Sequence, residues 1–222
     1  MGFKKLLTRV VYLFLMTGVG FAHVSVAVAA EQSLSEAVKV GDGGTVRSLL
    51  ENGVAVDSRE PDGTTALHWA AHHDHEEIAR LLLVSGASVD AVNRYEVTPL
   101  ALAALNGSAG MIERLLDAGA DPNRPNPEGE TPLMTAARTG NRLALTVLLE
   151  HGADVDAIEA WRGQTALMWA VAQNQVDAVD VLLRAGADPN ARSTGGFTPI
   201  LFAAREGYLD VLDALVLSLI HI

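Results

Sequence analysis

Apolar and small residues recur along the chain in a single pattern whose period is close to 33 residues. Each copy opens with threonine, then proline or alanine, then leucine or isoleucine, and continues with two short apolar runs of helical spacing. The openings are Thr65-Ala66-Leu67, Thr98-Pro99-Leu100, Thr131-Pro132-Leu133, Thr165-Ala166-Leu167 and Thr198-Pro199-Ile200, and the steps between their threonines are 33, 33, 34 and 33 residues. A fixed period of this length predicts stacked copies of one structural unit.

The unit from Glu128 to Ala157 shows how the pattern predicts two helices. Thr131 can cap a first helix by offering its hydroxyl to free backbone N–H groups, and Pro132 stands where a missing N–H costs nothing. Gly140 and Gly152 can end the two helices in the left-handed conformation. The apolar positions between these signals are Leu133, Ala136, Ala137, Leu143, Val147, Leu148 and Leu149. The predicted fold class is therefore all-α.

These openings and their spacing resemble the ankyrin repeat over residues 33–216. The resemblance implies an all-α ankyrin-repeat solenoid of helix-turn-helix units with hairpin loops, which binds a partner and carries out no reaction. It divides the chain into a degenerate N-terminal capping repeat, 31–59, and five repeats, 60–92, 93–125, 126–158, 159–192 and, incomplete, 193–216. An atypical first unit suits a cap, because the end of a stack must show one polar face to water.

Four positions depart from the repeat pattern. Glu96 stands where the other hairpins carry glycine, which favours a different turn conformation there. Asp74 and Asn174 replace the glycine between the two helices, and both residue types tolerate left-handed geometry better than most. One extra residue near Trp161 lengthens a single hairpin tip, a change that is compatible with stacking.

The first 30 residues have the three parts of a Sec-type signal peptide. A basic start is followed by an apolar run, Val10 to Phe21, and by small residues, Ala27 to Ala30. Cleavage there predicts a periplasmic or secreted protein, and removing three basic residues takes the net charge from −11 to −14. An uncleaved membrane anchor is the alternative, because Val10 to Ala30 is about long enough to span a bilayer.

The C-terminal end lacks both the expected glycine, whose place Leu219 takes, and a polar cap. One interpretation is that residues 217–222 are an artefact of the gene prediction and that the natural protein is longer. The other is a hydrophobic terminal helix that packs on the last unit or against another chain.

Composition and motifs exclude several classes of function. Cysteine is absent, which removes disulfides, thiol nucleophiles and cysteine-based zinc sites. The negative charge argues against nucleic acid and anionic membranes as partners. No phosphate-binding loop and no Gly-x-Ser-x-Gly motif occurs, so the sequence predicts neither an enzyme nor a cofactor.

A group of histidines raises the question of a metal site. His68 and His72 lie one helical turn apart, a spacing that can serve a metal. The resemblance accounts for His68, however, because that position usually supports the turn by hydrogen bonding, and His75 lies where a second helix starts. We therefore predict no metal site and assign His72 and His73 to the partner-facing side of the first helix.

The resemblance also implies where a protein partner would bind. In this family, contacts come from the hairpin tips and the exposed side of the first helices, which form one concave surface. The residues predicted to bind a protein partner are His72, His73, Arg94, Tyr95, Arg138, Trp161, Arg162, Phe197 and Arg205. Tryptophan, tyrosine and arginine dominate interface energetics, and arginine suits carboxylates. The arginines could instead merely solubilise exposed turns, and Trp69 and Trp169 are expected to pack between units.

Two hypotheses about function follow. The first is an exported, non-catalytic and monomeric scaffold that binds a protein partner, with no nucleic acid and, after signal cleavage, no membrane. The alternative is the N-terminal binding region of a longer exported protein, whose missing C-terminal part holds more repeats or an enzymatic domain.

Overall fold

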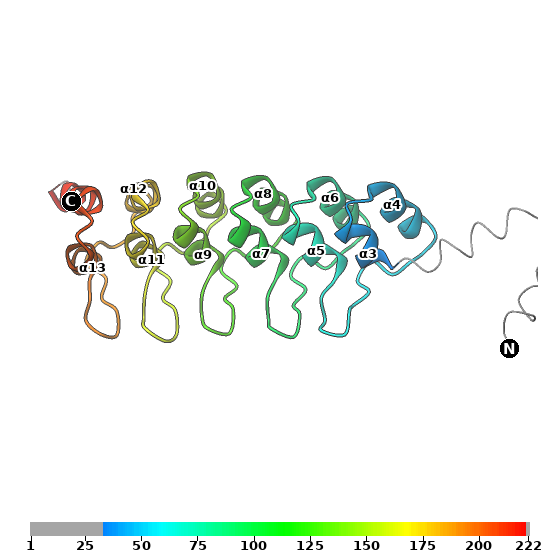
Figure 1. Cartoon of the computed structure of the whole chain (residues 1–222), viewed down its shortest axis with the longest axis horizontal. Helices are drawn as coiled ribbons and strands as arrows, with labels where there is room; N and C mark the ends of the chain where they lie inside the picture. Colours follow the sequence, from blue (N-terminus) through cyan, green and yellow to red (C-terminus); the bar gives the residue numbers. More distant parts are fainter. Residues whose placement is uncertain (1–32, 221–222) are drawn as a thin grey trace, which may run out of the picture. The chain divides into compact units, whose positions relative to one another are not determined.

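The computed structural model describes residues 33–220, so the predicted signal peptide, 1–30, and the last two residues of the chain lie outside the described residues. Within this range the chain forms twelve α-helices that follow one another in pairs (Figure 1). The pairs are α3 (Leu34–Lys39) with α4 (Gly43–Glu51), α5 (Ala66–His72) with α6 (Glu76–Val84), α7 (Pro99–Asn106) with α8 (Ala109–Asp117), α9 (Pro132–Thr139) with α10 (Arg142–Glu150), α11 (Ala166–Ala172) with α12 (Val176–Arg184), and α13 (Pro199–Glu206) with α14 (Leu209–Ile220).

The helix pairs stack side by side in two rows. The first helices of the pairs form one row and the second helices form the other, while the hairpin loops project from the row of first helices (Figure 1). Each helix packs on its partner within the pair and on the equivalent helix of the next pair. This arrangement confirms the predicted all-α solenoid of helix-turn-helix units. No described helix is both long enough and apolar enough to cross a membrane.

The helix starts and ends follow the signals read from the sequence. The hydroxyl of Thr131 accepts the backbone N–H of Met134 at 3.3 Å, and Pro132 occupies the first helical position of α9. The same cap recurs at Thr98 of α7, with an N···O distance of 3.1 Å. Gly140 ends α9 in the left-handed conformation, with φ of 76°. Local capping chemistry therefore repeats with the sequence period.

The turn at Glu96 corrects one expectation. Glu96 has φ of 56°, the same left-handed conformation as the glycines of the other hairpins, so the prediction of a different turn was wrong. Its N–H donates to the carbonyl of Asn93 at 3.0 Å, as the N–H of Gly129 donates to the carbonyl of Asn126 at 2.9 Å. The closed hairpin imposes this geometry at a cost of about 1–2 kcal/mol. Asp74 and Asn174 have φ of 57° and 56°, as predicted.

Small residues allow the first helices to approach one another closely. At one equivalent position, each first helix of the five repeats has a fully buried alanine, and at another, each second helix has a fully buried leucine. These residues are Ala70, Ala103, Ala136, Ala170 and Ala203, and Leu82, Leu115, Leu148, Leu182 and Leu215. All of them belong to one continuous apolar cluster. Because each unit contacts only its neighbours, stability is close to a sum over units and their interfaces.

Polar contacts fix the register between repeats. After α4, α6, α8 and α10, an Asp or Asn side chain accepts a backbone N–H from the corresponding loop of the next repeat. The acceptors are Asp57, Asp90, Asn123 and Asp156, and the donors are Ser88, Asp121, Asp154 and Asp188, with N···O distances of 3.0, 3.3, 2.7 and 2.9 Å. Several carboxylates of this acidic chain therefore hold the stack together.

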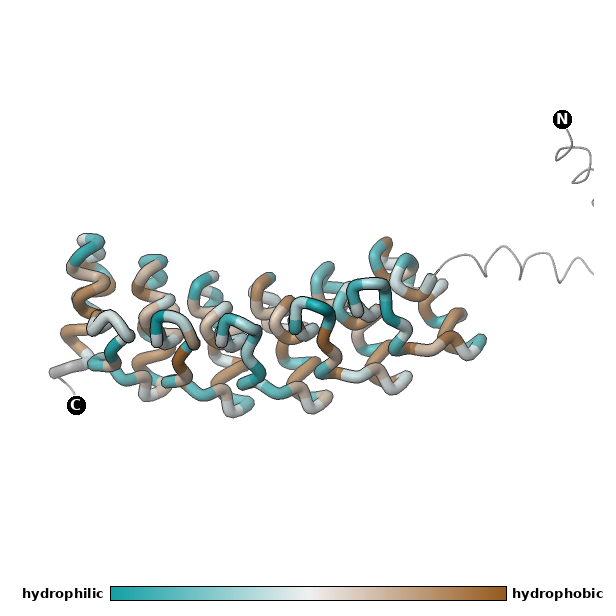
Figure 2. Tube along the Cα trace, turned by 90° about the horizontal axis from the view of Figure 1, so that it is seen from below, coloured by the Kyte–Doolittle hydropathy of each residue, from teal (hydrophilic) through white to brown (hydrophobic). Residues whose placement is uncertain are grey.

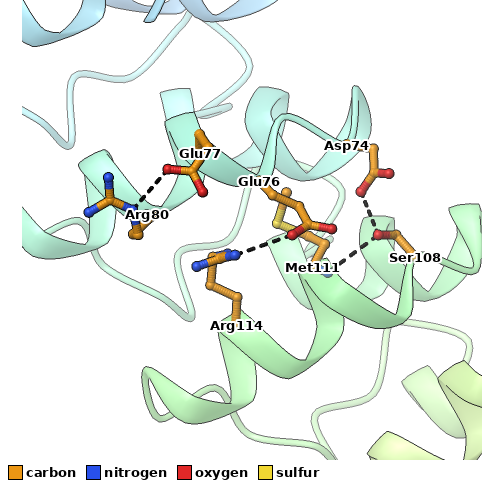
Figure 3. Close-up of polar contacts among 7 residues, drawn as sticks. All are labelled: Asp74, Glu76, Glu77, Arg80, Ser108, Met111 and Arg114. Carbon is orange, nitrogen blue, oxygen red and sulfur yellow. Dashed lines mark hydrogen bonds and ion pairs between the residues drawn. The ribbon is translucent and has the colours of Figure 1, made fainter.

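The row of second helices is joined by charged and polar side chains (Figure 3). Arg114 of α8 lies 3.2 Å from the carboxylate of Glu76 on α6, and the Ser108 hydroxyl donates to the carboxylate of Asp74. Gly110 lies against the Glu76 carboxylate, which would have to shift to make room for a Cβ there. A groove of about 340 Å³ lies between α6 and α8 beside these residues.

Candidate partner-binding surface

Five hairpin tips project from the first helices, and each is closed by a backbone hydrogen bond. We call these tips, residues 60–64, 93–97, 126–130, 159–164 and 193–197, together with the exposed side of the first helices, the hairpin surface. Figure 2 looks onto it, and the tips that face the viewer are largely hydrophilic. All nine residues predicted to bind a partner lie on the tips or in and directly after the first helices.

Neighbouring tips are linked by backbone hydrogen bonds. The N–H of Arg94 donates to the carbonyl of Asp62 at 2.7 Å, and the N–H of Thr194 donates to the carbonyl of Arg162 at 2.7 Å. Between the second and third tips, Pro127 occupies the position of Arg94 and has no N–H to donate. The tips therefore form a row that is tied together by the backbone, with one link that proline removes.

The lengthened fourth tip is organised by Glu159. The N–H of Gly163 donates to the Glu159 carbonyl at 3.2 Å, four residues back, whereas the corresponding bond of the second tip spans three residues. The buried Glu159 carboxylate accepts the backbone N–H groups of Trp161 at 2.6 Å, Arg162 at 2.7 Å and Gln164 at 3.2 Å. Sequence reasoning missed Glu159. The sequence feature that could have revealed its role is an acidic residue at the first position of the lengthened tip, 159–164.

Three aromatic side chains on the tips are exposed to solvent. Trp161 is 77% exposed, Tyr95 62% and Phe197 39%. Phe197 is the least exposed because its ring lies 5.5 Å from that of Phe202 on α13. The structure thus places all three where a partner could cover them, and their role in binding stays a prediction.

Cations lie against aromatic rings along the first helices. Lys39 of α3 lies 4.5 Å from the ring centre of Trp69 on α5, and Arg138 of α9 lies 5.9 Å from that of Trp169 on α11. Each cation comes from the repeat that precedes its aromatic partner. Both tryptophans are half-buried and pack on the core, as expected for contacts between units. Sequence reasoning missed Lys39, whose amino group also pairs with Glu60 at 2.8 Å, the main reason why its pKa is raised.

The other three arginines predicted to bind a partner, Arg94, Arg162 and Arg205, differ in their contacts within the chain. The Nη2 of Arg94 donates to the carbonyl of Pro61 at 2.8 Å, which adds a link between two tips. Arg205 lies 5.4 Å from the ring centre of Phe202 and pairs with Glu206 at 2.8 Å. Arg162 is exposed on the fourth tip.

His68 supports the hairpins from inside the stack. Its Nδ1 accepts the backbone N–H of Thr65 at 3.2 Å, and its Nε2 lies 3.0 Å from the carbonyl of Val97 in the next hairpin. With Nδ1 accepting, Nε2 carries the proton and donates it to that carbonyl. Burial lowers the pKa of His68, which favours this neutral form. The expected turn-supporting role is confirmed.

His72, at the end of α5, and His73 and His75, between α5 and α6, form a row of ring contacts. The ring of exposed His73 lies 5.8 Å from Trp69, 4.9 Å from His72 and 5.6 Å from His75. Desolvation, and then the charges of His72, His75 and Lys39, lower the pKa of His73. In the part of the chain that the structure describes, no three His, Asp or Glu side chains are placed to hold a metal ion.

Charge differs between the two rows of helices. The second helices of the five repeats carry nine carboxylates and four arginines, whereas the first helices carry two arginines and one carboxylate. The charged residues of the first helices are Arg138, Arg205 and Glu206. Two pairs of carboxylates three residues apart, Asp177 with Asp180 and Asp210 with Asp213, lie on the second helices α12 and α14. The first helices therefore carry far fewer carboxylates than the second helices, whereas the five tips carry six, namely Glu60, Asp62, Glu96, Glu128, Glu130 and Glu159.

Comparison with known proteins identifies the family. A sequence model of ankyrin repeats in three copies matches residues 34–126 and 110–193, which together span more than half of the chain. The chain therefore belongs to the ankyrin-repeat family. Proteins of this family typically act as non-catalytic scaffolds that mediate protein–protein interaction.

Solved structures support the same assignment. An ankyrin repeat domain (ABAYE2397) from Acinetobacter baumannii AYE is 29% identical, with a TM-score of 0.79, and the match covers 85% of this chain and 98% of that one. The ankyrin repeat protein EF0377 is 30% identical, with a TM-score of 0.77 and coverage of 82% and 96%. The ankyrin repeat domain of Bcl-3, a member of the IkappaB family, is 32% identical, with a TM-score of 0.77 and coverage of 83% and 85%.

Curated relatives match over shorter stretches. Ankyrin repeat domain-containing protein 63 of Homo sapiens is 40% identical over 57 residues, which is 26% of this chain and 15% of that protein. Palmitoyltransferase AKR1 of Candida albicans is 43% identical over 53 residues, which is 24% of this chain and 6% of that protein. The chain thus spans a small part of the length of these relatives.

Proposed function

We propose that the chain is an exported scaffold that binds a protein partner through its hairpin surface and does not catalyse a reaction. The exposure of Tyr95, Trp161 and Phe197 on the tips carries this proposal. An aromatic side chain buries about 150–250 Å² when it is covered, and tryptophan and tyrosine are enriched among the few interface residues whose truncation costs about 2 kcal/mol or more. In this proposal the scaffold is a monomer, and its partner is neither nucleic acid nor, after signal cleavage, a membrane.

Affinity capture from the envelope and secreted fractions of the source organism tests the binding surface. The variant Tyr95→Ala/Trp161→Ala/Phe197→Ala should recover much less of a partner that the unchanged chain retains. A matched control is available on the second helices, because Val84, Leu143 and Leu209 are 80%, 67% and 72% exposed. Changing these three to alanine should leave recovery unchanged. Equal recovery by both triple variants would count against the hairpin surface.

Export rests on the three-part N-terminal sequence and has its own test. We expect the mature protein to be periplasmic or secreted and to begin close to Glu31. N-terminal sequencing of the protein isolated from these fractions measures this directly. An intact Met1 would contradict cleavage and favour the membrane-anchor alternative.

The end of the last repeat favours a second candidate function, the N-terminal binding region of a longer exported protein. Leu201 of α13 is 49% exposed, whereas Met134 and Met168 at the same position of α9 and α11 are 1% and 0% exposed because the next repeat covers them. On α14, Val216 is 42% exposed, whereas its equivalent on α8, Leu116, is 7% exposed.

A further helix pair would cover this apolar end, as it does in the inner repeats. Sequencing the genomic locus beyond codon 216 distinguishes the two candidates. A reading frame that continues into another Thr-Pro-Leu unit or into a further domain supports the longer protein. A stop codon directly after Ile222 refutes it.

A further inference from the structure

We propose that the fourth repeat and α9, the first helix of the repeat before it, form a carboxylate-binding anchor, which holds an acidic segment of the partner protein. The anchor consists of Arg138, Trp161, Arg162 and Trp169. This inference rests on the proposed function and specifies which chemistry the hairpin surface recognises.

Arg138 supplies a positioned guanidinium that no carboxylate neutralises. It is half-buried and lies 5.9 Å from the ring centre of Trp169, yet within residues 33–220 no carboxylate oxygen lies within 4.0 Å of its nitrogens. Arg205, by contrast, pairs with Glu206 at 2.8 Å. A guanidinium that packing already orients loses less freedom when it binds, and its forked donors match a carboxylate.

Arg162 adds a second free cation on the lengthened tip. Its closest acidic neighbour in sequence is Glu159, whose carboxylate is already occupied by three backbone N–H groups. On the preceding tip, the Glu130 carboxylate accepts the side-chain amide of Asn126 at 3.3 Å. Glu128 is the exposed carboxylate of that tip. Among the described residues, Arg162 therefore has no ion-pair partner of its own.

The two tryptophans give the anchor an apolar part. Trp161 is 77% exposed and adjoins Arg162 in the chain. Trp169 exposes part of its ring, but its indole Nε1 is buried and has no hydrogen-bond partner within the described region, so it can offer ring surface and not a hydrogen bond. The anchor thus fits a segment that carries a carboxylate next to an apolar side chain.

Charge selects between acidic and basic partners. The first helices of the five repeats carry one carboxylate, Glu206, which pairs with Arg205, whereas the second helices carry nine. An acidic segment that approaches the first helices therefore meets little repulsion there. The acidic second helices repel it, which favours docking along the first helices. The tips carry six carboxylates, so this preference does not extend to them.

Selection from a random peptide library displayed on phage tests this proposal. The probe is a library of 12-residue peptides panned against the whole 222-residue chain. We expect the recovered peptides to be enriched in Asp and Glu beside an apolar residue. Their affinity should fall by about tenfold or more in Arg138→Gln and in Arg162→Gln, because each change removes a charged partner. Arg138→Lys keeps the charge but not the fork and should give a smaller loss.

Arg142→Gln is the matched control, because Arg142 lies on α10 and pairs with Asp180 at 3.7 Å. It should bind the peptides as the unchanged chain does, and circular dichroism should show that all variants stay folded. Peptides without acidic enrichment, or acidic peptides that bind both glutamine variants normally, would overturn the anchor. If the peptides of either kind bind the Tyr95→Ala/Phe197→Ala variant of the chain more weakly, the proposed function stands without the anchor. If that variant also binds them normally, both proposals fail.

Discussion

The Glu159 carboxylate organises the fourth tip, so Glu159→Ala should loosen that tip selectively. The change removes the acceptor of three backbone N–H groups, at N···O distances of 2.6, 2.7 and 3.2 Å. A hydrogen bond to a charged acceptor contributes about 1.5–3 kcal/mol. Because water can hydrogen-bond to the freed N–H groups of the exposed tip, we expect the free energy of opening the tip to fall by only about 2 kcal/mol.

Amide hydrogen exchange measures this local cost. A cost of about 2 kcal/mol corresponds to roughly 30-fold faster exchange at Trp161, Arg162 and Gln164. In Glu159→Gln, one oxygen can still accept from Arg162 and Gln164, whose N–H groups both bond to Oε1, whereas the bond of Trp161 to Oε2 is lost. The glutamine variant should therefore show its largest acceleration at Trp161.

Glu128→Ala provides the control, because Glu128 is exposed at the preceding tip and the structure shows no hydrogen bond in which its carboxylate is the acceptor. It should change the free energy of unfolding by less than about 0.5 kcal/mol. Unchanged exchange at all three amides of the fourth tip in Glu159→Ala would refute the role given to this carboxylate.

Three further predictions concern the stack. Leu148→Ala, at a fully buried position, should lower the free energy of unfolding, measured by urea titration, by about 3–5 kcal/mol. Leu143→Ala, at 67% exposure, should lower it by under about 0.5 kcal/mol, and equal costs would contradict the assigned core. Because the pKa of His68 is lowered from 6.5 by burial, the unfolded state binds its proton more readily, so the contribution of His68 to stability should be constant well above pH 6.5 and fall below it. Urea titrations across this range should show a weaker decline in His68→Asn, and an identical decline would argue against a buried neutral ring. Met134→Gln should destabilise the chain by about 1–3 kcal/mol in thermal unfolding, because it buries a polar amide under the next repeat. Leu201→Gln, at the same position of α13, should cost less because Leu201 is 49% exposed. A larger cost for Leu201→Gln would contradict the view that these two positions are equivalent and differ only in coverage.

The repeated parts of the fold could be predicted from the sequence because their causes are local. Thr131, Pro132 and Gly140 act through backbone groups within a few residues, so their spacing alone predicts where α9 begins and ends. Glu96 was misjudged because residue preference favours glycine at left-handed positions, whereas the hairpin around Glu96 imposes that conformation.

The candidate site could be predicted only in part. The exposure of Tyr95 and Trp161 follows from the repeat pattern, which has no packing use for an aromatic residue on a tip. The contact between Lys39 and Trp69 joins different repeats, and whether a cation there reaches the ring depends on side-chain geometry that no spacing rule gives. Glu159 was missed because its role depends on the shape of one lengthened tip.

Binding of a protein partner through the hairpin surface is the central claim, and hydroxyl-radical footprinting of the isolated complex tests it most directly. Oxidation of Tyr95, Trp161 and Phe197 should fall several-fold on complex formation, because these exposed rings become covered. Oxidation of Leu143 and Val84 on the second helices should not change. Protection of Leu143 and Val84, with the three aromatic rings still fully reactive, would contradict the claim.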